Sequence, residues 1–290
     1  MMTVFDTQRG NGMLPQNLSL SVARHASLGR CIKYLLTVCL LAATHVAGEE
    51  IVQLPSANGA TLPYLLSADL PANGEKPQVT AILFNGGEGV IGLTEKGIPQ
   101  PGANFLVRHR GLFVARGIPV ALIDVPSDSR GMSDSFRMSQ RHFDDVKSVA
   151  DDLQKRFPET RLFLIGTSRG TVSAGYAGAA LSPRLAGVVL TSSLFNGNRA
   201  GSGLAGFDFA AIKAPLLFVH HVDDGCRFTP YYAARSLSAK YPLISVKGGK
   251  EARSDPCEPF SQHGYFGKEK ETVDAIVDWM QGKPYPTNIE

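Results

Sequence analysis

The sequence predicts an α/β fold, a mostly parallel sheet of about eight strands flanked by helices. From residue 79 onward, short apolar runs alternate with stretches of helical character, as is typical of parallel strands joined by right-handed crossovers. The runs are nearly continuously apolar, which indicates strands covered on both faces. With 290 residues, 43% of them hydrophobic, the chain is long enough for one large domain with a single core.

Six apolar runs are predicted as the parallel strands. They are residues 79–84 (VTAILF), 119–125 (PVALIDV), 161–166 (RLFLIG), 187–192 (GVVLTS), 215–221 (PLLFVHH) and 242–247 (PLISVK). Residues 49–75 place Pro and Gly among short alternating stretches, which favours one or two leading antiparallel strands. Together these segments give the expected sheet.

Four stretches between or after the runs are predicted as helices. They are residues 105–117, residues 139–157, the Ala- and Gly-rich stretch after Ser168, and residues 270–282. The first ends at a glycine and the second stops before a proline, both common helix ends. His109 and His142 fall in the first two helices, where we expect them on the surface.

The first 48 residues have the features of a secretory signal. Arg30 and Lys33 precede a short apolar run, and small residues follow up to Gly48. The run is well short of the roughly 20 residues that a bilayer span requires. We therefore expect a leader over residues 1–48 and a secreted or periplasmic domain over residues 49–290 with no membrane span. An uncleaved anchor is the alternative.

The charge balance changes when this leader is set aside. The whole chain has 29 basic and 26 acidic residues. The leader holds four of the basic residues and one of the acidic ones, which leaves 25 of each in the mature chain. An even balance does not favour nucleic acid as a partner, and nothing in the sequence indicates an oligomeric state.

The pentapeptide GTSRG, residues 166–170, stands where an apolar run gives way to a helical stretch. The chain must reverse within a few residues there, so the hydroxyl of Ser168 is exposed on strained backbone. Glycines two positions before and after it keep side chains from colliding with the strand and the helix. The pattern predicts a nucleophile, and a helix-capping role for Ser168 is the alternative.

A serine nucleophile needs a base, and the base needs a carboxylate that orients it. Reactive groups in a parallel sheet collect at the C-terminal ends of the strands. One such end, HHVDDGC, offers Asp223 and Asp224, and His263 is the one histidine that follows them in the chain. The chain order is therefore Ser, Asp, His.

That order, with a serine at a strand–turn–helix, resembles the α/β-hydrolase family. The resemblance covers essentially all of residues 50–282. The family's His-Gly-x-x-Asp strand end is matched by residues 220–224, which implies that Asp224 is the acid and Asp223 the fallback. His221 replaces the usual glycine.

The resemblance implies a serine hydrolase that needs no cofactor and cleaves carboxylic esters of small molecules. His263 would take the proton of Ser168 as it attacks a carbonyl carbon, Asp224 would hold the imidazole, and water would hydrolyse the acyl-enzyme. A peptidase or thioesterase of the same fold, and a binding protein that has lost turnover, are the alternatives.

Two backbone donors are expected to bind the developing oxyanion. One is the N–H of Arg169. The other comes from the NGGEG segment, with Gly87 the first candidate and Gly86 the second. Asn85 stands where many family members have histidine, which leaves open how this loop is braced. The Arg169 side chain either meets an anionic substrate group or pairs with a nearby carboxylate.

Two cysteines remain beyond the leader, Cys226 and Cys257. An even pair in an exported domain predicts one disulfide, and both flanks have the composition of exposed loops. Two unpaired buried thiols are the alternative. Since Cys226 lies just beyond Asp224 and Cys257 just before His263, a disulfide would tie together the loops that carry acid and base.

A metal site and a large cap domain are not expected. His220 and His221 are adjacent in a strand, so they point to opposite faces and cannot easily reach one ion. Only residues 194–214 separate the run at 187–192 from the next, which is too short for a separate cap.

Overall fold

The computed structural model describes residues 46–70, 74–95, 97–98, 104–198 and 201–290. All described residues belong to one compact unit. The predicted leader lies outside the described residues, apart from its last three positions. Those positions, Val46–Gly48, begin the first strand of the sheet.

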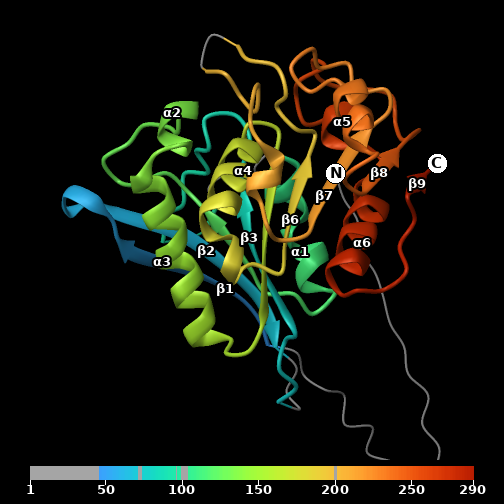
Figure 1. Ribbon diagram of the computed structural model, residues 1–290. Helices are drawn as coiled ribbons and strands as arrows, with labels where there is room; N and C mark the ends of the chain where they lie inside the picture. Colours follow the sequence, from blue (N-terminus) through green and yellow to red (C-terminus); the bar gives the residue numbers. More distant parts are fainter. Residues whose placement is uncertain (1–45, 71–73, 96, 99–103, 199–200) are drawn as a thin grey trace, which may run out of the picture. The chain divides into compact units, whose positions relative to one another are not determined.

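Nine strands form one sheet in the described part of the chain, in the order β1-β2-β4-β3-β5-β6-β7-β8-β9 (Figure 1). They are β1 (Val46–Pro55), β2 (Thr61–Leu70), β3 (Val79–Phe84), β4 (Val120–Ile123), β5 (Arg161–Thr167), β6 (Gly187–Thr191), β7 (Leu216–His221), β8 (Leu243–Val246) and β9 (Asn288–Ile289). The β1–β2 and β2–β4 pairs are antiparallel, and the other neighbours are parallel. The predicted fold class is confirmed, including the two leading antiparallel strands. The sequence missed only β9, because two residues carry no periodic pattern.

The described α-helices are α1 (Phe105–Val114), α2 (Asp134–Arg137), α3 (Gln140–Arg156), α4 (Gly170–Leu181), α5 (Tyr231–Leu237) and α6 (Glu269–Met280). The four predicted helices correspond to α1, α3, α4 and α6. The short helices α2 and α5 were not predicted, since one or two turns show little amphipathic period. None of the helices described here has both the length and the apolar surface needed to cross a bilayer.

Different helices cover the two faces of the sheet. In β3, Ile82 and Phe84 pack in a core cluster with α3 and α4, whereas Ala81 and Leu83 pack in a second cluster with α1 and α6. Neighbouring side chains of a strand point to opposite faces, so each one meets a helix layer. This double burial explains why the strands are apolar at nearly every position.

His142 corrects one expectation, because it is buried and not on the surface. It lies one helical turn before Val146 on the face of α3 that packs on the sheet, with its ring against Phe84 and Phe136. Burial, helped by the nearby Arg137 cation, lowers the pKa of His142 to about 3. The imidazole is therefore a neutral core group.

Candidate active site

Ser168 lies at the turn between β5 and α4 with a φ of 53°, in the left-handed region. A Cβ on Gly166 would collide with the carbonyl of Gly170, and a Cβ on Gly170 would collide with the carbonyl of Phe84. Both glycines of the pentapeptide are therefore required by close backbone approach, as predicted. The N-cap of α4 is Arg169 and no side chain caps this helix, so Ser168 is not a capping serine.

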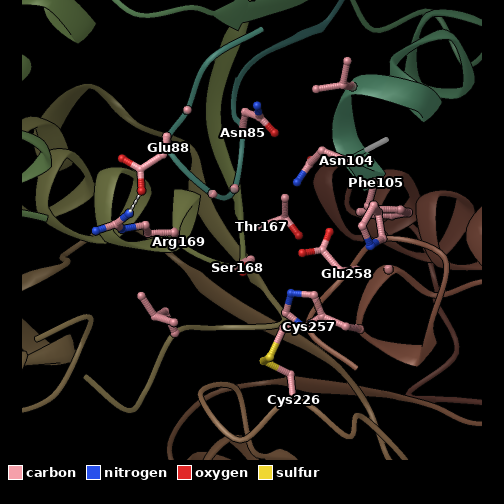
Figure 2. Close-up of a pocket in the computed structure, with 18 of the residues that line it drawn as sticks. Asn85, Glu88, Asn104, Phe105, Thr167, Ser168, Arg169, Cys226, Cys257 and Glu258 are labelled. Carbon is pink, nitrogen blue, oxygen red and sulfur yellow. Dashed lines mark hydrogen bonds and ion pairs between the residues drawn. A yellow bond between two sulfur atoms is a disulfide. The ribbon is translucent and has the colours of Figure 1, made fainter. Parts of the chain in front are cut away.

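Ser168 and His263 line the same cavity, which has a volume of about 480 Å³. Figure 2 labels Ser168 among the lining residues. The cavity lies at the C-terminal ends of the central strands, between the loop after β3, the start of α1 and the loops that follow β7 and β8. Gly86, Gly87 and Arg169 line it as well. The predicted nucleophile, base and backbone donors thus share one cavity.

Asp224 bonds His263, with Oδ2 3.1 Å from Nδ1. The Asp224 side chain is fully buried, and its oxygens also accept hydrogen bonds from the Cys226 N–H at 2.9 Å and the Thr229 hydroxyl at 2.8 Å. Asp223 instead is exposed. Of the two candidate acids, Asp224 is therefore the one that the fold brings to the imidazole.

Thr229 is a member of this cluster that the sequence did not reveal. Its hydroxyl is buried and lies 3.1 Å from His263 Nδ1 in addition to its bond to Asp224. No motif distinguishes this threonine from others in loops, and only its nearness to Asp224 in the chain could have suggested it. It gives the carboxylate a donor that holds it in place.

The loop that carries His263 is anchored to the ends of β6 and β7. The hydroxyl of Ser192 donates to the His263 carbonyl at 2.8 Å. The Tyr265 hydroxyl accepts from the Ser192 N–H at 3.0 Å and donates to the Val219 carbonyl at 2.7 Å. Burial raises the pKa of Tyr265, so this phenol remains protonated and keeps donating.

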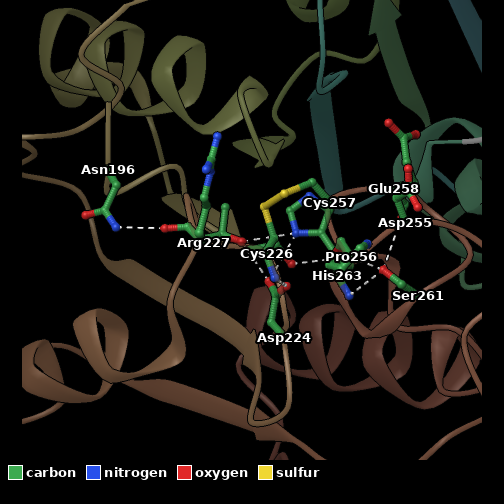
Figure 3. Close-up of a disulfide and its surroundings, with 12 residues drawn as sticks. Asn196, Asp224, Cys226, Arg227, Asp255, Pro256, Cys257, Glu258, Ser261 and His263 are labelled. Carbon is green, nitrogen blue, oxygen red and sulfur yellow. Dashed lines mark hydrogen bonds and ion pairs between the residues drawn. A yellow bond between two sulfur atoms is a disulfide. The ribbon is translucent and has the colours of Figure 1, made fainter. Parts of the chain in front are cut away.

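Cys226 and Cys257 form the predicted disulfide, with Cα atoms 4.6 Å apart (Figure 3). The alternative of two free thiols is therefore wrong. The bond joins the segment just after Asp224 to the segment just before His263, and the flanking segments are largely exposed, as expected.

The loop after β3 lies directly against the nucleophile. A Cβ on Gly86 would lie 3.1 Å from the Cβ of Ser168, and Gly87 has a φ of 55°. The Gly86 carbonyl accepts from the Gly89 N–H at 3.0 Å. Within the described residues, the N–H groups of Gly86 and Gly87 have no hydrogen-bond acceptor, so both amides can serve a bound substrate.

Arg137 braces this loop, in which Asn85 stands where many α/β-hydrolases have histidine. Its guanidinium is fully buried and donates to the carbonyls of Asn85 and Gly87, each at 3.3 Å, and to the Ser173 hydroxyl at 2.8 Å. Burial lowers the pKa of Arg137 to about 9, which leaves it charged at neutral pH. No sequence pattern indicates this role, because Arg137 lies on the short helix α2, far from the loop in the chain.

The Arg169 side chain pairs with carboxylates. Arg169 is 5% exposed, and its guanidinium bonds Asp134 at 2.7 Å and Glu88 at 2.5 Å. Figure 2 shows the bond to Glu88. Asp134 is buried, and its other oxygen accepts from the Gly203 N–H at 2.8 Å. Of the two alternatives for Arg169, the structure therefore favours carboxylate pairing over contact with an anionic substrate.

His220 and His221 bond different parts of the structure. His220 Nε2 accepts from the Ser193 N–H at 2.9 Å, whereas His221 Nε2 donates to the Gly248 carbonyl at 3.0 Å. Burial lowers the pKa of His220 to about 3, so this imidazole is neutral. Over the residues that the structure describes, no three His, Cys, Asp or Glu side chains are grouped so as to hold a metal ion.

No protein-family model and no curated protein matches the sequence. Solved structures do match. The 2,6-dihydroxy-pseudo-oxynicotine hydrolase aligns with a TM-score of 0.57 at 18% identity over 84% of this chain and 72% of its own. Est1E from Butyrivibrio proteoclasticus aligns at 0.55 and 15% identity, covering 81% and 98%. An α/β serine hydrolase without a lid from Xanthomonas campestris aligns at 0.53 and 17% identity, covering 81% and 97%. With its sheet order and its serine turn, this chain therefore has the α/β-hydrolase fold.

Proposed function

We propose that the protein is a secreted or periplasmic serine hydrolase that cleaves carboxylic esters of small molecules. The observation that carries the proposal is the shared cavity, in which a strained serine turn faces the same space as a histidine bonded to a buried aspartate. Export is inferred from residues 1–48 and is supported by the disulfide, which persists in oxidising compartments.

The chemistry follows from the tautomer of His263. With Nδ1–H donating to Asp224, the lone pair of Nε2 is free to take the proton of the Ser168 hydroxyl. The Ser168 oxygen then bonds the carbonyl carbon, and the carbonyl electrons move to oxygen. The N–H groups of Arg169 and Gly87, with Gly86 as second candidate for the latter, bind this oxyanion. His263 protonates the leaving alcohol. Water then gives a proton to His263 and attacks the acyl carbonyl, and the Ser168 oxygen leaves with that proton as the acid is released.

Small esters suit the cavity better than long lipids or folded proteins. Its volume of about 480 Å³ lies in the range typical of small-molecule sites. Between β6 and β7 the described residues form only a short 3-10 helix, Phe209–Ala211, so they build no cap domain there. Two structural neighbours are named as esterases, a cold-adapted one and a thermostable one, which favours ester hydrolysis over peptide or thioester cleavage.

A fluorophosphonate probe tests the proposal. Wild-type protein should be labelled on Ser168 and should hydrolyse p-nitrophenyl esters. Ser168→Ala should lose the label and at least about 10³-fold in kcat. Ser238→Ala, at an exposed serine at the end of α5, is the matched control and should behave as wild type. An unlabelled, inactive wild type would instead identify a binding protein.

A further inference from the structure

Asn104 lines the cavity and caps helix α1. Its side-chain oxygen accepts a hydrogen bond from the Leu106 N–H at 3.1 Å. A backbone N–H can only donate, so the atom that faces it must be the carbonyl oxygen. The orientation of the amide is thereby fixed, and the NH₂ group must point the other way.

The NH₂ group of Asn104 lies beside the proposed nucleophile. The position of a Cβ on Gly86 would be 2.9 Å from Asn104 Nδ2 and 3.1 Å from the Ser168 Cβ, so both atoms border the same point. Figure 2 shows the amide nitrogen directed toward the centre of the cavity. The absence of a side chain at Gly86 is what leaves room for this amide.

Within the described residues, Asn104 Nδ2 donates to no acceptor. The carboxylate of Glu258 lines the same cavity but forms no hydrogen bond with this amide. The residue itself is well held. Phe105, Leu106 and Val107, which follow it in α1, are all buried in the core. A fixed donor with an open bonding direction is suited to a charge that develops in a reaction, because no reorganisation is needed to meet it.

We propose that Asn104 is a further catalytic residue, whose side-chain amide donates a hydrogen bond to the substrate carbonyl oxygen as Ser168 attacks it. This inference rests on the proposed function. The amide adds a side-chain donor to the backbone donors of the oxyanion site. Because the oxygen gains charge in the tetrahedral intermediate, the bond strengthens there, and its loss lowers kcat more than it raises KM.

Two substitutions remove the amide NH₂ donor and keep the helix cap. Ser and Asp both cap helices well, so Asn104→Ser and Asn104→Asp should leave the melting temperature near that of wild type. Asn104→Ser should lower kcat on p-nitrophenyl esters about 10²-fold with KM little changed. Asn104→Asp should lose more, since its carboxylate repels the oxyanion. A trifluoromethyl ketone, which forms a tetrahedral adduct with the serine, should bind Asn104→Ser more weakly by a similar factor.

Asn196→Ser is the matched control. Asn196 is exposed, does not line the cavity, and donates its amide to the Arg227 carbonyl at 2.8 Å, so its kcat should equal that of wild type. If wild type is labelled and active but both Asn104 variants keep kcat within about twofold, or if only KM changes, the inference is wrong. If wild type is neither labelled nor active, the proposed function itself has failed.

Discussion

The two sides of the cavity are held in place by different means. On the nucleophile side, two buried arginines join the serine turn, the loop after β3 and α2. Arg137 of α2 donates to carbonyls of the loop. Arg169, next to the serine, pairs with Glu88 of the loop and Asp134 of α2. On the base side, the loops after β7 and β8 are joined by a disulfide among exposed residues. Burial makes non-covalent bonds strong, whereas exposed loops gain little from them.

The difference matches the distance along the chain that each side must close. Ser168 sits on one continuous strand–turn–helix, and its neighbours come from the adjacent strand β3. Asp224 and His263 are 39 residues apart, and their loops contribute few buried apolar side chains. The disulfide spans 31 residues and lowers the entropy of the unfolded chain by the equivalent of about 3–4 kcal/mol. The disulfide thus holds the base-side loops in place, whereas buried hydrogen bonds and ion pairs hold the nucleophile side.

The largest effect is expected from the acid. Asp224→Asn should lower kcat about 10⁴-fold, because an amide stabilises the wrong imidazole tautomer, while the free energy of unfolding changes little. Asp223→Asn, at the exposed neighbour, is the control and should keep its activity. Steady-state kinetics of the two variants would reveal an error in the assignment of the acid if Asp223→Asn were the inactive one.

Replacing Arg137 should damage the nucleophile side next. Arg137→Met removes the donor from the carbonyls of Asn85, which is buried, and Gly87, so unfolding should cost about 3 kcal/mol less. The loop would also lose its brace, and kcat should fall about 10²-fold. Arg137→Lys keeps the charge and should recover part of both. Urea unfolding and kinetics measure the two effects, and a stable Arg137→Met enzyme with full activity would contradict the role of Arg137.

Removing the disulfide should affect the base side first. Cys226→Ser combined with Cys257→Ser should unfold about 3 kcal/mol more easily. In a reductant series, activity should fall before the near-UV circular dichroism signal does, because the loops separate while the sheet persists. Labelling of Ser168 should weaken, since His263 is no longer held. Parallel loss of activity and structure would show that the bond supports the whole fold and not the base side.

The smallest effect is a pH dependence that both sides share. His142 packs on the nucleophile side and His220 on the base side, and burial lowers the pKa of each to about 3. Unfolding returns each pKa to about 6.5, so the unfolded chain binds more protons below that pH. Stability is complete above pH 6.5 and falls toward pH 3 as acid is added. Between pH 6.5 and 5.5 each histidine should lower the free energy of unfolding, measured with urea, by about 1 kcal/mol. His142→Gln and His220→Gln should each abolish the contribution of one histidine to this decrease.

Some parts of the site could be predicted because neighbours in the chain determine them. The serine turn needs glycines at 166 and 170 for reasons of local backbone contact, and the pentapeptide displays them. The pairing of Cys226 with Cys257 followed from their even number. The surface position predicted for His142 was wrong. The polarity of one side chain does not show which face of a helix is buried, whereas the spacing of the apolar residues in the same helix does.

By itself the sequence determined the alternation of strands and helices, the serine turn and the order of the three candidate catalytic groups. These depend on period and local sterics, which act over a few residues. The tertiary structure alone placed Asp224 rather than Asp223 beside His263, brought Arg137 behind the loop after β3, and turned the Asn104 amide into the cavity. Those outcomes depend on which buried groups meet across the core, and a buried polar group must find its partner wherever packing brings one.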